Sequence, residues 1–77
     1  MSEIEDLKKR VREFAQSRNW EKFHTPKNLA MAVAGEAGEL AAEFQWLTPE
    51  ESSGLTKDQL KAVELEMADV AIYLLRL

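Results

Sequence analysis

The stretch TPKNLAMAVAGEAGELAAEFQWL, residues 25–47, decides the fold, because its apolar side chains recur at the spacing of one helix face. That face consists of Leu29, Val33, Leu40, Phe44 and Leu47. Thr25 followed by Pro26 is typical of an N-cap and a first helical residue. We therefore expect a helix from Pro26 to about Trp46.

Two further helices are expected on either side of this one. An apolar stripe opposite a charged face predicts a helix over residues 2–18, capped by Ser2. The stripe consists of Ile4, Leu7, Val11 and Phe14. Thr56 and Gln59 have the spacing of a capping box, which predicts a helix over residues 56–77. The intervening segments are expected to be connectors, so the fold class is all-α with three main helices.

The last helix is apolar on most of its surface, as a central or interface helix is. Its main stripe is expected to be Leu60, Val63, Met67, Val70, Leu74 and Leu77. In a chain with three helices, such a surface must be covered by another copy or by missing sequence. Gly35 and Gly38 each weaken their helix by about 1 kcal/mol relative to alanine, which indicates close approach by another backbone or a ligand.

The length of 77 residues allows one domain, expected over residues 1–77. A domain this small buries little apolar area, and without cysteine it has no disulfide to stabilise it. Oligomerisation or a bound metal is the favoured source of extra stability. The sequence ends inside the last expected helix with no stop signal, so the domain is either naturally short or truncated at its C-terminus.

The charge distribution excludes several classes of protein. The net charge is −4, with 14 acidic and 10 basic residues, and no basic stripe for nucleic acid is present. No apolar run approaches the ~20 residues that span a bilayer, and the charged first residues are unlike a secretory signal. We expect a cytoplasmic protein without nucleic-acid or membrane partners.

Four carboxylates lie where solvent-exposed acids are not expected. Glu36 falls between Val33 and Leu40 inside an apolar stripe, and Glu39 flanks the same stripe. The last helix repeats the spacing, because Glu66 and Asp69 are three residues apart beside its main stripe. The four carboxylates are therefore Glu36, Glu39, Glu66 and Asp69. Burying unpaired like charges costs several kcal/mol. Two acidic pairs without basic partners therefore predict a bound cation.

Oxygen ligands favour magnesium, manganese or calcium. A di-iron bundle is disfavoured, because it needs Glu-x-x-His pairs and His24 is not three residues after any glutamate. A single Glu-x-x-Glu pair is common on exposed helices, so the prediction rests on finding two pairs beside apolar stripes.

Aromatic and polar residues cluster around the start of the central helix. Trp20, His24 and Asn28 precede or begin it, and Trp46 closes it. One interpretation is that the tryptophans belong to the core or an interface, as aromatic residues usually do. The other is a nucleobase pocket, in which flat rings stack on a base while polar groups contact its edge.

These residues together resemble the MazG-like nucleotide pyrophosphohydrolases, and most closely their dCTP pyrophosphatase branch. The resemblance covers almost the whole chain and is strongest in WEKFHTPKNLAMAVAGEAGELAAEFQW, residues 20–46, and ELEMADVAIYLLRL, residues 64–77. The family's metal motif is E-x-x-E, a spacer, then E-x-x-D. It corresponds here to the segments EAGE, residues 36–39, and EMAD, residues 66–69.

The resemblance implies magnesium-dependent hydrolysis of nucleoside triphosphates to monophosphate and pyrophosphate, in cleansing of the nucleotide pool. A dCTP-like substrate is favoured, and Mn²⁺ is a substitute metal. It implies homodimers or homotetramers with four-helix-bundle-like cores. The matching metal ligands are Glu36, Glu39, Glu66 and Asp69, with Glu36 and Glu39 also in catalytic roles. The matching substrate-binding residues are Trp20, His24, Asn28 and Trp46. The alternative function is a non-catalytic helical oligomerisation or interaction module.

Overall fold

Helix α4, Lys57–Arg76, packs along helix α2, Pro26–Ala42, to form the body of the computed structural model. The structure describes residues 2–77. Its other elements are α1 (Glu3–Ser17), the 3₁₀ helix η1 (Glu21–Phe23) and the short α3 (Pro49–Ser52). No strand occurs within the described residues, which confirms the all-α prediction.

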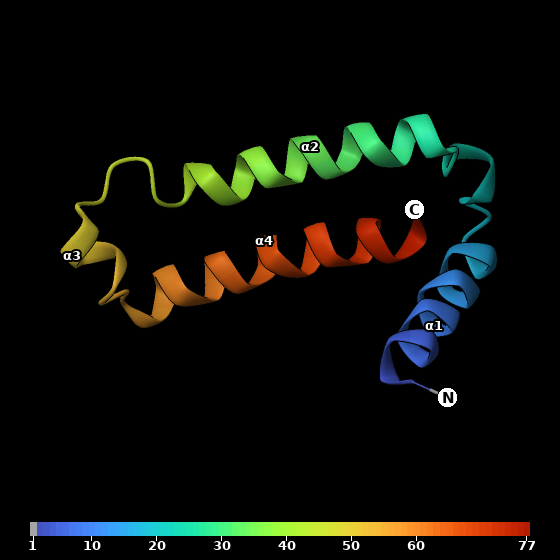
Figure 1. The fold of residues 1–77 in the computed structure, drawn as a ribbon, viewed down its shortest axis with the longest axis horizontal. Helices are drawn as coiled ribbons and strands as arrows, with labels where there is room; N and C mark the ends of the chain where they lie inside the picture. Colours follow the sequence, from blue (N-terminus) through green and yellow to red (C-terminus); the bar gives the residue numbers. More distant parts are fainter. Residues whose placement is uncertain (1) are drawn as a thin grey trace.

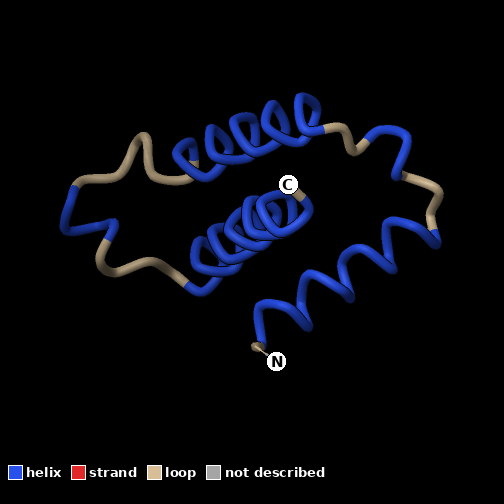
Figure 2. Tube along the Cα trace, turned by 45° about the vertical axis from the view of Figure 1, so that its right-hand side comes forward, coloured by secondary structure: helices blue, strands red, loops and turns tan. Residues whose placement is uncertain are grey.

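Helices α2 and α4 run antiparallel and side by side, joined at one end by the segment that contains α3 (Figures 1 and 2). Helix α1 leaves the opposite end of α2 and contacts α4 over a smaller area. The start of α2, the connector before it and the C-terminal end of α4 are therefore neighbours. This arrangement brings residues from two distant parts of the sequence to one end of the helix pair.

The helix starts lie where the sequence predicts them, because each has a local capping residue. The Ser2 hydroxyl accepts a hydrogen bond from Glu5 N, and the Thr25 hydroxyl accepts one from Asn28 N. At the start of α4 the Thr56 hydroxyl accepts from Gln59 N, while Gln59 Oε1 accepts from Thr56 N. Such a reciprocal pair satisfies two backbone donors that the helix itself cannot.

The end of α2 differs from the prediction. The helix ends at Ala42 and not near Trp46, because the following amides donate to carbonyls three residues back. Phe44 N, for example, donates to Ala41 O at 3.0 Å. The chain tightens into turns there and then extends at Thr48, as the residue before a proline usually does.

Helix α3 is an element that the sequence analysis placed in a connector. Its start is a second capping box, in which the Thr48 hydroxyl accepts from Glu51 N and Glu51 Oε1 accepts from Thr48 N. Pro49 occupies the first helical position. The signal was thus present in the sequence TPEE, residues 48–51.

The face of α4 that packs on its neighbours is rotated from the predicted stripe. Val63 is buried and Val70 half-buried, as expected, but Leu60, Met67 and Leu74 are 47%, 54% and 53% exposed. The half-buried positions beside Val63 are instead Gln59, Ala62, Glu66 and Tyr73. The two faces differ by one residue, or about 100° around the helix.

The core of the chain is small. Ala15, Leu29 and Val63 are the buried hydrophobic residues of the described part, and one comes from each long helix. Large apolar side chains remain exposed on all three of these helices. Gly35 and Gly38 also face open space, since within residues 2–77 no atom outside the local helix lies within 4 Å of a Cβ built at either position. The expected close approach is not made by this chain's own described residues.

Among the described residues, none of the helices is both long enough and apolar enough to cross a membrane.

Candidate functional site

A cluster of carboxylates lies between α2 and α4. Glu36 comes from the middle of α2, and Glu66 and Asp69 come from successive turns of α4. One carboxylate oxygen from each of these three residues lies within 4.8 Å of the others. Because the helices run antiparallel, residues far apart in the sequence meet here without any loop contribution.

Glu66 is the innermost member of this cluster. It is half-buried, and its Oε2 is buried without a hydrogen-bond partner among the described residues. Burial raises the pKa of Glu66 above its ordinary value of 4.5, and the adjacent Glu36 carboxylate raises it further. Repulsion from Asp69 and Glu39 raises the same pKa by smaller amounts.

These features fit a bound cation. A buried carboxylate oxygen without a partner, facing two further carboxylates, is an arrangement that a positive charge stabilises. The donor set consists of oxygen atoms alone, which suits magnesium, manganese or calcium better than the softer transition metals. The residues present at this site therefore fit the class of metal that the sequence analysis expected.

Glu39, the fourth expected ligand, lies apart from the other three. It is exposed and does not belong to the group of converging oxygens, although it is close enough to affect the pKa of Glu66. It lies one turn along α2 from Glu36, toward the end that carries α3.

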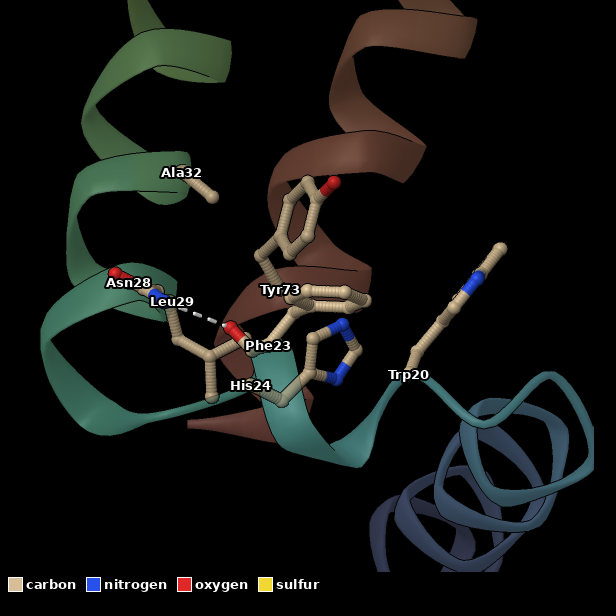
Figure 3. A pocket seen from close by; sticks show the side chains of 7 residues that line it. All are labelled: Trp20, Phe23, His24, Asn28, Leu29, Ala32 and Tyr73. Atoms are coloured by element: carbon tan, nitrogen blue, oxygen red, sulfur yellow. Dashed lines mark hydrogen bonds between the residues drawn. The ribbon is translucent and has the colours of Figure 1, made fainter.

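An aromatic pocket lies at the other end of α2, where the connector, α2 and α4 meet (Figure 3). Its volume is about 320 Å³. Its lining includes three of the four expected substrate-binding residues and four that were not expected. The residues that line it are Trp20, Phe23, His24, Asn28, Leu29, Ala32 and Tyr73.

The pocket wall is a row of aromatic rings. The ring of Trp20 meets that of Phe14 edge-on, with centroids 5.5 Å apart. The Trp20 ring also lies beside the His24 imidazole, with centroids 6.4 Å apart. His24 in turn lies 6.5 Å from Tyr73 at a steep angle, so the imidazole is held between two rings (Figure 3). Arg76 Nε donates a hydrogen bond of 3.2 Å to His24 Nδ1 from the last turn of α4.

Asn28 fixes the connector to the start of α2. Its Nδ2 donates a hydrogen bond of 3.1 Å to the carbonyl oxygen of Phe23 (Figure 3). Its backbone amide is occupied by the Thr25 cap. The side-chain oxygen of Asn28 is thus the part of this residue that remains available as an acceptor to a ligand.

Trp46 does not line this pocket. It follows the opposite end of α2 and is 86% exposed, whereas Trp20 precedes the helix start. A helix of 17 residues is about 25 Å long. The two tryptophans that the resemblance assigns to one base pocket are therefore separated within this chain.

A groove extends from the aromatic pocket to Asp69, one member of the acidic cluster. The groove has a volume of about 810 Å³, runs between α1 and α4, and includes Asp69, Tyr73 and Arg76 in its lining. These three residues are four and three positions apart, so they follow one side of α4. Trp20 and His24 line both the groove and the smaller pocket.

Tyr73 and Arg76 were missed by the sequence analysis. The signal that would have found them is their helical spacing from Asp69, which places both on the side of α4 that carries an expected ligand.

The antiparallel helix pair with its internal carboxylates and adjacent aromatic pocket defines an all-α protein with a candidate divalent-metal centre. Comparison with known proteins narrows this class. A crystal structure of a pyrophosphatase from Archaeoglobus fulgidus superposes with a TM-score of 0.87 at 43% sequence identity, covering 99% of this chain and 71% of that one. The chain belongs to the MazG-like family of all-α nucleotide pyrophosphohydrolases, which confirms the resemblance drawn from the sequence.

Curated relatives agree with this assignment. Human dCTP pyrophosphatase 1 is 45% identical over 76 residues, and the Bos taurus protein of the same name is 43% identical over 77. Each alignment covers 96% of this chain but 45% of the relative, so the chain spans less than half the length of these relatives. No protein-family model matches the chain.

Proposed function

We propose that this protein hydrolyses nucleoside triphosphates to nucleoside monophosphates and pyrophosphate, with a dCTP-like substrate favoured. One observation carries the proposal. Asp69 of the acidic cluster and Tyr73 of the aromatic pocket lie one helical turn apart in a common groove. A nucleotide bound along α4 would therefore have its phosphates beside the carboxylates and its base between the rings.

The carboxylates would hold magnesium, with manganese as a substitute. Glu36, Glu66 and Asp69 supply converging oxygens, and Glu39 would complete the set from the edge. When bound, the metal neutralises phosphate charge and makes a water molecule more acidic. A bound cation would lower the pKa of Glu66, which burial and the neighbouring carboxylates raise in its absence.

The remaining catalytic roles belong to the chain's own residues. Water attacks the α-phosphorus, the bond from that phosphorus to the bridging oxygen breaks, and pyrophosphate leaves. Glu39 is exposed one turn from Glu36, so one of its two carboxylate oxygens would orient the water and accept its proton. Glu36 lies between α2 and α4, where its carboxylate would hold the metal beside the substrate phosphates.

The aromatic pocket would bind the base. Trp20 offers a stacking surface, and such stacking contributes about 1–3 kcal/mol per base in single-strand binders. His24 and the side-chain oxygen of Asn28 would contact the base edge. Trp46 would join the pocket only from a second copy of the chain, since it lies at the far end of α2 in its own.

We propose that residues 1–77 form a single helical domain that works as a homodimer or homotetramer in the cytoplasm, cleansing the nucleotide pool. The exposed side chains of Leu60, Met67 and Leu74 on α4 support an assembly in which a second copy covers that face. The same exposed surface also favours the alternative, a non-catalytic module that joins other helices through its apolar faces.

Product analysis tests the proposal. The protein is incubated with each deoxynucleoside triphosphate, with and without Mg²⁺, and the products are separated. Monophosphate plus pyrophosphate, formed only with Mg²⁺, is the expected result, whereas diphosphate plus phosphate would show that the cleavage site is wrong. Glu36→Gln should abolish turnover while Glu13→Gln, on the exposed surface of α1, should not. Turnover that survives in the Glu36 variant would refute its role.

A further inference from the structure

His24 is the only histidine in the sequence. Its side chain accepts a hydrogen bond that, unlike the others in the described part of the chain, comes from a residue far away in the sequence. Arg76 Nε donates a hydrogen bond of 3.2 Å to His24 Nδ1, and the contact is partly buried. Every other side-chain hydrogen bond recorded among residues 2–77 joins positions three to five apart in the sequence. The Arg76 contact instead joins the connector before α2 to the last turn of α4.

The direction of this hydrogen bond defines the form of the imidazole. A guanidinium group has donors and no acceptor, so His24 Nδ1 must offer a lone pair. A neutral imidazole with a lone pair on Nδ1 carries its single proton on Nε2. The contact with Arg76 therefore selects one of the two neutral tautomers of His24.

The neighbouring rings fix where that proton points. His24 lies between Trp20 and Tyr73, with ring centroids 6.4 Å and 6.5 Å away. Figure 3 shows the ring nitrogen farther from the backbone directed toward the part of the pocket lined by Phe23 and Tyr73. The pocket thus receives one N–H donor from His24, while the opposite side of the ring is occupied by Arg76.

We propose that Arg76 is a positioning residue, which holds His24 as a neutral hydrogen-bond donor to the base edge of the substrate. The inference rests on the proposed function, because it assigns the pocket to a nucleobase. The N–H group of His24 would select a base that carries a hydrogen-bond acceptor on its edge, such as a pyrimidine carbonyl oxygen. Arg76 acts through His24 and need not touch the base.

Nitrogen NMR of the imidazole tests this directly, because a single histidine leaves no ambiguity of assignment. In the ¹⁵N-labelled protein without substrate, we expect Nε2 to be protonated and Nδ1 to be unprotonated. Arg76→Met keeps much of the aliphatic side chain but removes the donor, so the two tautomers should then exchange and average. Arg10→Met is the matched control, since Arg10 lines the same groove and its loss changes the net charge equally.

A wild-type spectrum with a protonated Nδ1, or an Arg76→Met spectrum identical to that of the wild type, would overturn the proposal. The wild-type spectrum alone shows whether Nδ1 is protonated, even where a variant fails to fold. This readout requires no turnover. If no nucleotide is hydrolysed while the tautomer is fixed as expected, the proposed function fails and the assignment of the tautomer by Arg76 stands.

Kinetics test the consequence for the substrate. Arg76→Met should raise the KM for dCTP about tenfold, the scale of one charge-assisted hydrogen bond, with little change in kcat. If Arg76 acts through His24, the substitution should have no further effect in a His24→Phe background. Independent, additive effects of the two substitutions would show that Arg76 contacts the substrate by itself and would overturn its positioning role.

Discussion

Glu36 and Glu66 face each other across the α2–α4 pair, with carboxylate oxygens within 4.8 Å. Their proximity, together with burial, keeps the pKa of Glu66 above its ordinary value. The helix packing therefore brings two like charges together at the centre of the protein's largest interhelical contact. Without a cation this arrangement opposes folding, and with one it stabilises the folded chain.

The stability of the metal-free protein should fall as the pH rises. The pKa of Glu66 is raised on folding, so the folded state binds more protons than the unfolded state between 4.5 and the raised value. Below pH 4.5 this group is protonated in both states and opposes folding least. Thermal unfolding in EDTA at a series of pH values should show the Glu66 contribution as a loss of Tm with rising pH.

Glu66→Gln is the comparison for that series, because it removes the titrating group and keeps the shape. The wild type should lose more Tm than this variant as the pH rises from 4.5 to neutrality. Equal slopes in the two proteins would contradict the raised pKa of Glu66. Glu64→Gln, a neighbouring exposed position, should behave like the wild type.

The carboxylates should contribute unequally to metal binding. Asp69→Asn removes the negative charge of one of the three converging carboxylates and should weaken Mg²⁺ binding about tenfold or more. Glu39→Gln should weaken it less, because Glu39 lies outside that group, yet it should lower kcat if this carboxylate accepts the proton from water. Calorimetric titration with Mg²⁺ separates the two effects, and equal losses of affinity would argue against the distinction.

The two tryptophans should respond differently to dilution. Trp20→Ala should raise KM by about 5- to 150-fold, the equivalent of 1–3 kcal/mol of stacking, at every protein concentration. Trp46→Ala should raise KM only while the assembly is intact, since Trp46 is far from the pocket of its own chain. Initial rates measured over a dilution series check this. Trp20→Phe, which keeps an aromatic ring, should restore part of the affinity.

A charge on the outer face of α4 should dissociate the assembly. Met67 is 54% exposed in the single chain, so Met67→Glu has room to be accommodated there. If a second copy covers this face, burying the unpaired carboxylate would cost several kcal/mol and shift the protein to monomers. Sedimentation velocity measures the shift. Lys61→Glu, at a more polar position of the same helix, is the control and should leave the assembly unchanged.

Local features of the fold were predictable from sequence, because they depend on residues close together in the chain. The caps at Ser2, Thr25 and Thr56 lie where the side-chain pattern places them. The end of α2 was not predictable in the same way. Residues 43–46 are compatible with a helix, and no proline or glycine lies between Ala42 and Pro49 to end it.

The orientation of α4 shows a second limit. Its apolar residues surround the helix, so periodicity alone does not choose which of them pack within the chain and which remain for other contacts. The acidic cluster was nevertheless found, because Glu36 interrupts an apolar stripe and Glu66 borders one. Helical spacing places Tyr73 and Arg76 on the Asp69 side of α4, but it does not show that the connector packs there. The hydrogen bond from Arg76 to His24, for example, joins residues 52 positions apart.

Helix α2 lacks acidic residues in its first turn and basic residues in its last. It also contains Gly35 and Gly38, and within residues 2–77 nothing outside the local helix backbone packs against either. A helix of this composition is too weak to persist alone. Helix α4 has a capping box and complementary charges at both ends, so it should form early in folding and provide the surface on which α2 becomes helical. We therefore expect the acidic cluster to be assembled late, when α2 packs on α4, and amide exchange around Glu36 should be faster than exchange around Val63.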